Sequence, residues 1–144
     1  MTMAAGARWE HFPHGADIGI RGLGPTLDAA FEQVALALTA VMTEPARVEA
    51  RETIEVSCTA SNPDDLLYDW IDAIVFEMAT RGMLFGAYDV RIEGNRLASR
   101  LRGERVDRAR HEPAVEVKGP TYTQLHVSHD EARDEWVAQC VVDV

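Results

Sequence analysis

The stretch Asn62–Arg81, NPDDLLYDWIDAIVFEMATR, does most to decide the fold of this chain. Asn62 can cap a helix, and Pro63 suits the first helical position because its missing N–H would have no partner there. The apolar residues follow the spacing that lines one face of a helix, namely Leu66, Leu67, Trp70, Ile71, Ile74, Val75 and Met78. We therefore predict an amphipathic helix that ends near Arg81 and Gly82 and buries this face.

A second helix is predicted upstream, over residues 26–43. Thr26 can cap its start, and Pro45 stops the pattern shortly after Thr43. One face carries the apolar residues Leu27, Ala30, Phe31, Val34, Ala35, Leu38, Val41 and Met42. Because both helices are amphipathic, the rest of the chain must supply an apolar surface for them.

Several other segments alternate apolar and polar residues, which indicates β-strands. This alternation covers residues 54–58, 88–92 and 97–101. Gly94 and Asn95, between the last two segments, form a typical hairpin turn. We therefore predict at least one antiparallel strand pair in the middle of the chain, formed by residues 88–92 and 97–101.

Both ends of the chain also indicate β-structure. A first strand region runs over residues 8–12, breaks at residues 13–15 and resumes over residues 17–21. Near the other end, residues 122–128 and 136–144 flank a polar loop, so we predict a hairpin there. Alternation along the last strand puts Asp143 on the face opposite Trp136 and Cys140.

Together these elements predict a single α+β domain over residues 1–144, with two main helices packed on a mixed or antiparallel β-sheet. Residues 1–7 are expected to be flexible. The 144 residues suffice for one hydrophobic core without covalent staples. Cys58 and Cys140 each lie in a strand-like pattern, which favours two buried thiols over a disulfide.

Charge limits the function classes. The chain has 24 acidic and 14 basic side chains, a net charge of −10, so we expect no stable binding of nucleic acid. No apolar run approaches the roughly 20 residues of a membrane span. The first eight residues lack a charged leader followed by an apolar stretch. The sequence therefore predicts a cytoplasmic protein with no membrane association.

Two charged segments leave alternatives open. Six arginines against two acidic residues lie between Arg96 and Arg110, which is typical of a solvated hairpin or of a docking patch for a phosphate or an acidic partner. Asp65, Asp69 and Asp72 form a helical stripe beside the apolar face of residues 62–81. That stripe is either simply hydrated, recognised by a basic partner, or part of a metal site.

Oxygen donors stand near both ends of the chain. Asp17 follows a Pro- and Gly-containing break, where an irregular backbone lets main-chain groups approach a ligand. The sequence stops at Asp143 and Val144, so a side-chain carboxylate neighbours the α-carboxylate. A strand as apolar as residues 136–144 normally lies in the core, where an unpaired charge is costly, so we expect the charge of Asp143 to be compensated. If the first and last strands are neighbours, Asp17, Asp143 and Val144 suit Ca²⁺, with Mg²⁺ or Mn²⁺ as substitutes. The alternative is a capping Asp and a hydrated tail.

Other chemistries are weaker candidates. The histidine pairs His11/His14 and His126/His129 invite a zinc interpretation, but residues three apart in a strand point to opposite faces. His14 could instead orient a carboxylate or meet a partner. No serine-hydrolase elbow, P-loop or dinucleotide fingerprint is present in the sequence.

These residues resemble the archease family, the accessory proteins of RtcB-type tRNA-splicing RNA ligases, over nearly the whole chain. Pro13–Gly19 is similar to the family's N-terminal signature, although Pro13 replaces the first signature Asp. Leu66–Trp70 is similar to its Leu-Leu-x-x-Trp helix, residues 116–122 to its Glu-x-Lys and Thr-Tyr patterns, and Val142–Val144 to its terminal aliphatic-Asp-aliphatic end.

The resemblance implies a metal site and a function. It implies that Asp17, Asp143 and Val144 bind Ca²⁺. It also implies that the protein is not itself an enzyme but promotes guanylylation and multiple turnover of an RtcB-type RNA ligase in tRNA splicing and RNA repair. Two alternatives remain, a stand-alone metal-dependent phosphoesterase or nuclease using the same carboxylates, and a chaperone-like binding module.

Overall fold

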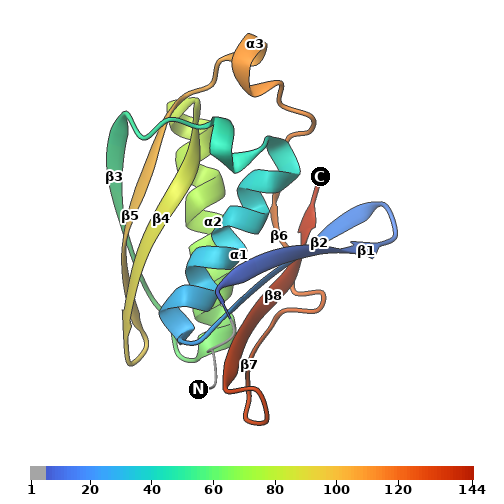
Figure 1. Cartoon of the computed structure of the whole chain (residues 1–144), viewed down its shortest axis with the longest axis vertical. Coiled ribbons are helices and arrows are strands. Elements are labelled where there is room, and N and C mark those ends of the chain that lie inside the picture. The colour runs from blue at the N-terminus through green and yellow to red at the C-terminus, as the bar shows by residue number, and fades with distance from the viewer. Residues whose placement is uncertain (1–5) are drawn as a thin grey trace.

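The computed structural model describes residues 6–144, so most of the segment that we expected to be flexible, residues 1–7, lies outside the described residues. Two long helices and two antiparallel β-sheets make up the fold (Figure 1). The α+β class predicted from the sequence is confirmed.

Both predicted helices form where the sequence placed them. Helix α1 spans Leu27–Met42, and the Thr26 side chain accepts a hydrogen bond from the Ala29 backbone N–H at 3.0 Å. Helix α2 spans Pro63–Arg81 and is capped in the same way by Asn62. It ends at Gly82, whose φ of 62° is left-handed and therefore suits glycine.

The first sheet contains the two ends of the described chain. Its strand order is β1-β2-β8-β6. Strand β7 also pairs with β8, along residues 135–139, whereas β6 pairs with residues 142 and 143. All pairs are antiparallel. The strands are β1 (Arg8–His14), β2 (Asp17–Gly24), β6 (Gly119–Pro120), β7 (His126–Asp130) and β8 (Glu135–Asp143).

The second sheet comes from the middle of the chain and has the order β3-β5-β4. Its strands are β3 (Glu52–Thr59), β4 (Met83–Glu93) and β5 (Arg96–Arg105). The predicted hairpin turn between β4 and β5 is confirmed, with Gly94 at a φ of 60°. Two short helices, η1 (Pro45–Arg47) and α3 (Arg108–His111), were not predicted.

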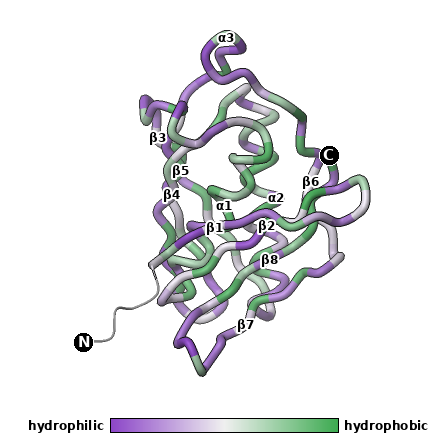
Figure 2. Tube along the Cα trace, turned by 45° about the vertical axis from the view of Figure 1, so that its right-hand side comes forward, coloured by the Kyte–Doolittle hydropathy of each residue, from purple (hydrophilic) through white to green (hydrophobic). Residues whose placement is uncertain are grey.

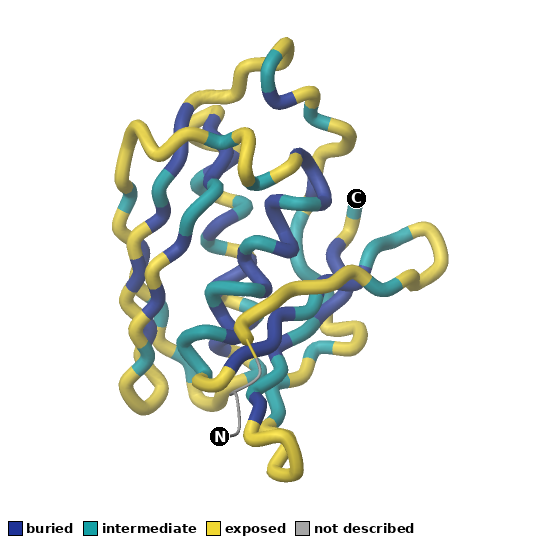
Figure 3. The backbone as a smooth tube through the Cα atoms, in the orientation of Figure 1, coloured by how far each residue is buried: buried dark blue, intermediate teal, exposed yellow. Residues whose placement is uncertain are grey.

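The two long helices lie between the sheets, with β3, β5 and β4 on one side and the β1-β2-β8 sheet on the other (Figure 1). Hydrophobic residues concentrate on α1, α2 and β8 (Figure 2), and the same elements are buried while β1 is largely exposed (Figure 3). Gly22 of β2 allows close contact with α1, because a Cβ there would lie 2.2 Å from the Ala30 carbonyl oxygen.

The sequence led us to expect one sheet, but the structure has two. The reason lies in α1, where apolar and small residues are buried around most of the helix, among them Phe31, Val34, Ala37, Leu38 and Val41. A helix that is apolar on more than one face needs cover on both sides. One sheet would leave part of that surface in water.

The first strand region also differs from expectation. It is a hairpin in which β1 and β2 run antiparallel, with the turn at Gly15 and Ala16. Pro13 stays within β1, opposite Ile18, which a proline tolerates because β1 lies at the sheet edge. At the other end, the predicted hairpin forms from β7 and β8, but β7 begins only at His126.

Candidate functional site: paired carboxylates at the end of β2 and β8

Strand pairing brings together the two acidic ends of the chain. In the antiparallel register of β2 and β8, Ile18 lies opposite Val142. Asp17 and Asp143 are the next residues after this pair, so the same register, continued by one step, would place them opposite each other. Figure 1 shows the C-terminus next to the β1–β2 hairpin. The expectation that the first and last strand regions are neighbours is confirmed.

Neither carboxylate has a cation of the described chain within ion-pair distance. Within residues 6–144, neither Asp17 nor Asp143 takes part in an ion pair or accepts a side-chain hydrogen bond. Like charges side by side on paired strands repel each other. The arrangement therefore favours a bound cation.

One step of the sequence argument was wrong. We reasoned that Asp143 ends an apolar strand and would carry a costly buried charge, but its residue is exposed and Asp17 is half-buried. The residues just before it, Val141 and Val142, are buried although they lie on opposite faces of the strand, so burial ends only at Asp143. The case for a site rests on the adjacency of two carboxylates and not on their burial.

The main chain around Asp143 is held in place. Its carbonyl oxygen accepts a hydrogen bond from the Lys118 N–H at 2.8 Å, and Gly119 of β6 pairs with it. Two residues earlier, the carbonyl of Val141 accepts both the backbone N–H and the hydroxyl of Thr121, at 3.0 and 2.7 Å. The end of β8 is thus fixed by its neighbour, which leaves the carboxylate oxygens of Asp143 free for another role.

The donor types fit a hard cation, since carboxylate oxygens are the ligands that Ca²⁺ prefers. Within residues 6–144, no three or more His, Cys, Asp or Glu side chains form a group that could hold a metal ion. The predicted set has only two such side chains, Asp17 and Asp143, and takes its third ligand from Val144. Metal binding here stays a prediction.

The histidines take separate positions. The Nε2 atom of His11 lies 2.8 Å from the Ala37 carbonyl oxygen, on α1. His14 is exposed and lies opposite Asp17 across the β1–β2 hairpin. His129 contacts Asp134 at 3.0 Å in the β7–β8 turn. Among the histidines of the two pairs, His14 is the one that the strand register places opposite Asp17.

A second acidic site is fully neutralised by the protein itself. Glu104 at the end of β5 is only 3% exposed, and both its oxygens receive Arg110 nitrogens at 2.6 Å. It also accepts the Glu49 backbone N–H at 2.6 Å and lies 3.1 Å from Nε2 of buried His111. The Arg110 hydrogen bonds, above all, hold the pKa of Glu104 far below its usual range.

The arginine-rich stretch is therefore partly structural. Arg110 binds Glu104, and Arg102 pairs with Asp89 at 2.7 Å. Three arginines of the stretch form no ion pair within residues 6–144, namely Arg96, Arg105 and Arg108. The remaining positive charge is smaller than the sequence count implied, because acidic partners from other strands neutralise part of it.

The two cysteines form no disulfide, as expected. Burial raises the pKa of Cys58 to about 11 and that of Cys140 to about 12. Both thiols are thus protonated near neutral pH, and neither is a suitable nucleophile.

Within residues 6–144, no helix combines the length and apolar character needed to cross a membrane.

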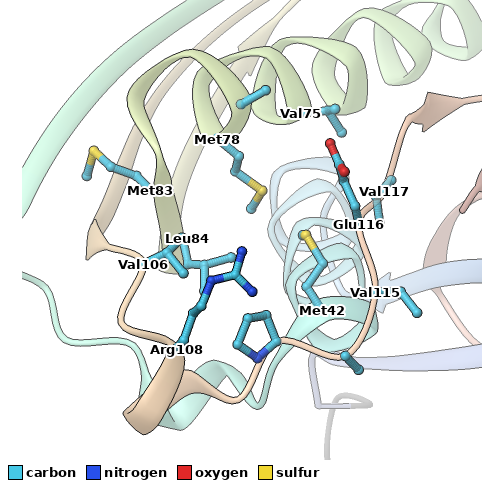
Figure 4. A pocket seen from close by; sticks show the side chains of 13 residues that line it. Met42, Val75, Met78, Met83, Leu84, Val106, Arg108, Val115, Glu116 and Val117 are labelled. Atoms are coloured by element: carbon cyan, nitrogen blue, oxygen red, sulfur yellow. The ribbon is translucent and has the colours of Figure 1, made fainter.

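A pocket that was not predicted from the sequence lies at the far end of α2. Its volume is about 370 Å³, and its wall is formed by the loop after β5 together with residues that include Met42, Met78 and Leu84. Figure 4 shows the Arg108 side chain reaching between these apolar groups. The loop also contributes Val106 and Val115 to the pocket, and both are exposed.

Fold and site together define a class, a small α+β protein whose two antiparallel sheets enclose two helices and whose last strand ends in an open pair of carboxylates. Residues 9–144 match the family described as Archease protein family (MTH1598/TM1083), and the chain belongs to the archease family.

Individual relatives agree with this assignment. The chain is 42% identical over 142 residues to "Protein archease" of Thermococcus gammatolerans and 38% identical to that of Pyrococcus abyssi, each time over 95% of this chain and 99% of the relative. Its fold is similar to the solution structure of Methanobacterium thermoautotrophicum protein 1598, with a TM-score of 0.78 and 28% identity over 94% of this chain and 98% of that one. The family resemblance read from the sequence is confirmed.

Proposed function

We propose that this chain is a metal-binding accessory protein of the cytoplasm that activates an RtcB-type RNA ligase by promoting its guanylylation and multiple turnover in tRNA splicing and RNA repair. Family membership supports the accessory role. The observation that supports the proposal is the pairing of Ile18 with Val142, the residues next to Asp17 and Asp143, together with the absence of an ion pair at either carboxylate within residues 6–144.

Three ligands would hold the ion. Asp17 and Asp143 contribute side-chain carboxylates, and Val144, at which this sequence ends, contributes its α-carboxylate. The bound ion, Ca²⁺ or in its place Mg²⁺ or Mn²⁺, would supply a fixed positive charge that stabilises phosphate oxygens. The strand pairing keeps the carboxylates in place before the ion arrives, so little reorganisation opposes binding.

The rest of the chain supports an accessory role better than hydrolysis. Glu104 is held as a buried, neutralised carboxylate, and both cysteines have raised pKa values, so none of these three residues is available as acid, base or nucleophile. The net charge of −10 opposes RNA binding but complements a basic RNA-binding enzyme. In this proposal the carboxylates serve the ligase's phosphoryl transfer, which depends on positioning and charge stabilisation.

The test is a reconstitution with an RtcB-type ligase, GTP, metal and RNA ends. Wild type should accelerate guanylylation and allow repeated ligation, whereas Asp17→Asn and Asp143→Asn should not. Asp134→Asn, an exposed carboxylate in the β7–β8 turn, is the matched control and should behave as wild type. Absence of stimulation by wild type would refute the activator role, and RNA cleavage by the protein alone would favour the phosphoesterase or nuclease alternative.

A further inference from the structure

One face of α2 carries acidic and aromatic side chains that the proposed metal site does not use. Asp65, Tyr68, Asp69, Asp72 and Phe76 follow the spacing i, i+3, i+4, i+7 and i+11, so they lie along one side of the helix. Buried residues such as Trp70 and Ile74 occupy the opposite side. We call these five residues, with Tyr122, the α2 stripe.

The aromatic members are unusually exposed. Tyr122 is 72% exposed and Phe76 61%, the two largest values among the exposed large hydrophobic residues of the described chain. The ring of Tyr122 nonetheless stacks on Tyr68, with centroids 4.5 Å apart and planes 4° apart. Stacking holds the rings in a defined orientation, so they present a flat apolar surface at small entropic cost to a partner.

The charge of this face has a single sign. No basic residue occurs from Asn62 to Thr80, and Arg81, at the end of the helix, is paired with Glu77. Partial desolvation and the charges of Asp65 and Asp72 raise the pKa of Asp69. Like charges one turn apart destabilise a helix, and a cationic partner would remove that cost. Charge complementarity thus selects a basic occupant.

The α2 stripe also adjoins the paired carboxylates through one short strand. Strand β6 pairs with the end of β8, where Gly119 lies opposite Asp143, and α2 packs against β6. Tyr122 follows β6 by two residues. One partner can therefore contact the α2 stripe and the carboxylate site at the same time.

We propose that the α2 stripe docks an arginine-bearing segment of the ligase that this protein activates. Arginine fits better than lysine, because a guanidinium stacks on a tyrosine ring and binds a carboxylate through two nitrogens. Phe76 accepts an apolar residue of the same segment. The inference rests on the proposed function and assigns binding to the α2 stripe and activation to Asp17 and Asp143.

Binding and activation are measured separately. Calorimetric titration of the ligase with Phe76→Ser, Tyr122→Ala and the pair Asp69→Asn with Asp72→Asn should give a Kd raised about tenfold or more for each, since about 1.4 kcal/mol corresponds to a factor of ten. At saturating concentration these variants should restore wild-type guanylylation. Asp17→Asn should show the reverse pattern, with a normal Kd and no activation, and Asp134→Asn should change neither.

The outcomes separate the two proposals. Unchanged affinity of all α2-stripe variants, with wild type still activating, would overturn the docking surface and leave the activator role intact. Stripe-dependent binding without activation would uphold the docking surface and refute the activator role. A photoreactive phenylalanine analogue at position 122 should crosslink to a ligase segment containing arginine, and crosslinking only to a segment without basic residues would overturn the assignment. Thermal melting checks that each variant folds.

Discussion

Two carboxylate sites in this molecule have opposite surroundings. At the end of β5, Glu104 is buried, and its oxygens are occupied by Arg110, His111 and the Glu49 backbone N–H. At the end of β2 and β8, Asp17 and Asp143 stand together with no ion pair among residues 6–144.

The comparison distinguishes a carboxylate that stabilises the fold, Glu104, from carboxylates that are free to bind a ligand, Asp17 and Asp143. A carboxylate whose oxygens are all satisfied by the protein stabilises the fold and has no capacity left for chemistry. Two adjacent carboxylates without a counter-charge repel each other in the protein alone and gain from binding a cation. Substitutions at the two sites should therefore have opposite effects on stability.

The largest change in stability is expected at Glu104, whose carboxylate oxygens are bound by the protein. Glu104→Ala leaves His111 and the Glu49 N–H without an acceptor in the interior, so the free energy of unfolding should fall by about 3 kcal/mol. Urea denaturation measures this. A loss below about 1 kcal/mol would mean that the Glu104 cluster is not the structural anchor that its contacts indicate.

Cation binding at Asp17 and Asp143 should change the free energy of unfolding by a similar amount, in the stabilising direction. With free Ca²⁺ at about 100 times its Kd, wild type should gain about 2.7 kcal/mol in unfolding free energy. Asp17→Asn should lose most of this gain, and Glu104→Gln should keep it because that site is remote from the ion. The measurement is urea denaturation with Ca²⁺ and with a chelator.

Low pH should destabilise the protein through protonation of Glu104. Because the folded-state pKa of Glu104 is lowered, its stabilising effect is fully present above the unfolded pKa of about 4.3 and is lost as the pH falls toward the folded value. Stability measured from pH 5 downward should therefore fall less steeply in Glu104→Gln than in wild type. Equal slopes would contradict the assignment.

A smaller loss is expected for Arg110→Lys. The guanidinium donates two hydrogen bonds of 2.6 Å to Glu104, and a lysine ammonium cannot reproduce this two-pronged geometry. The free energy of unfolding should therefore fall, but by less than in Glu104→Ala, as measured by thermal melting. A melting curve identical to that of wild type would show that charge alone, and not geometry, is what Glu104 requires.

The smallest effect should come from Asp143→Asn without metal. Because the side chain is exposed and unpaired, the change in stability should stay within about 0.5 kcal/mol and should be stabilising, since it removes a repulsion. A clear destabilisation in chelator would show that Asp143 has a structural partner.

Local signals in the sequence were sufficient for the helices. Caps and apolar spacing located α1 and α2 to within a residue or two. The pairing of the two end segments was a conditional expectation that the β2–β8 register confirms.

Features that depend on contacts between distant segments were not predictable. The division into two sheets follows from how α1 is covered on both sides, which periodicity does not reveal. In the sequence, Glu104 is one of two acidic residues in an arginine-rich stretch, and only the return of the chain at α3 brings Arg110 onto it. The Tyr68–Tyr122 stack likewise joins residues 54 positions apart.

The most direct measurement is a calorimetric titration of Ca²⁺ into wild type, the double variant Asp17→Asn with Asp143→Asn, and a form with one alanine appended after Val144. We predict saturable binding to wild type, no detectable binding to the double variant, and weakened binding to the extended form because its α-carboxylate is displaced. Equal binding by all three proteins would contradict the claim that these carboxylates form the metal site.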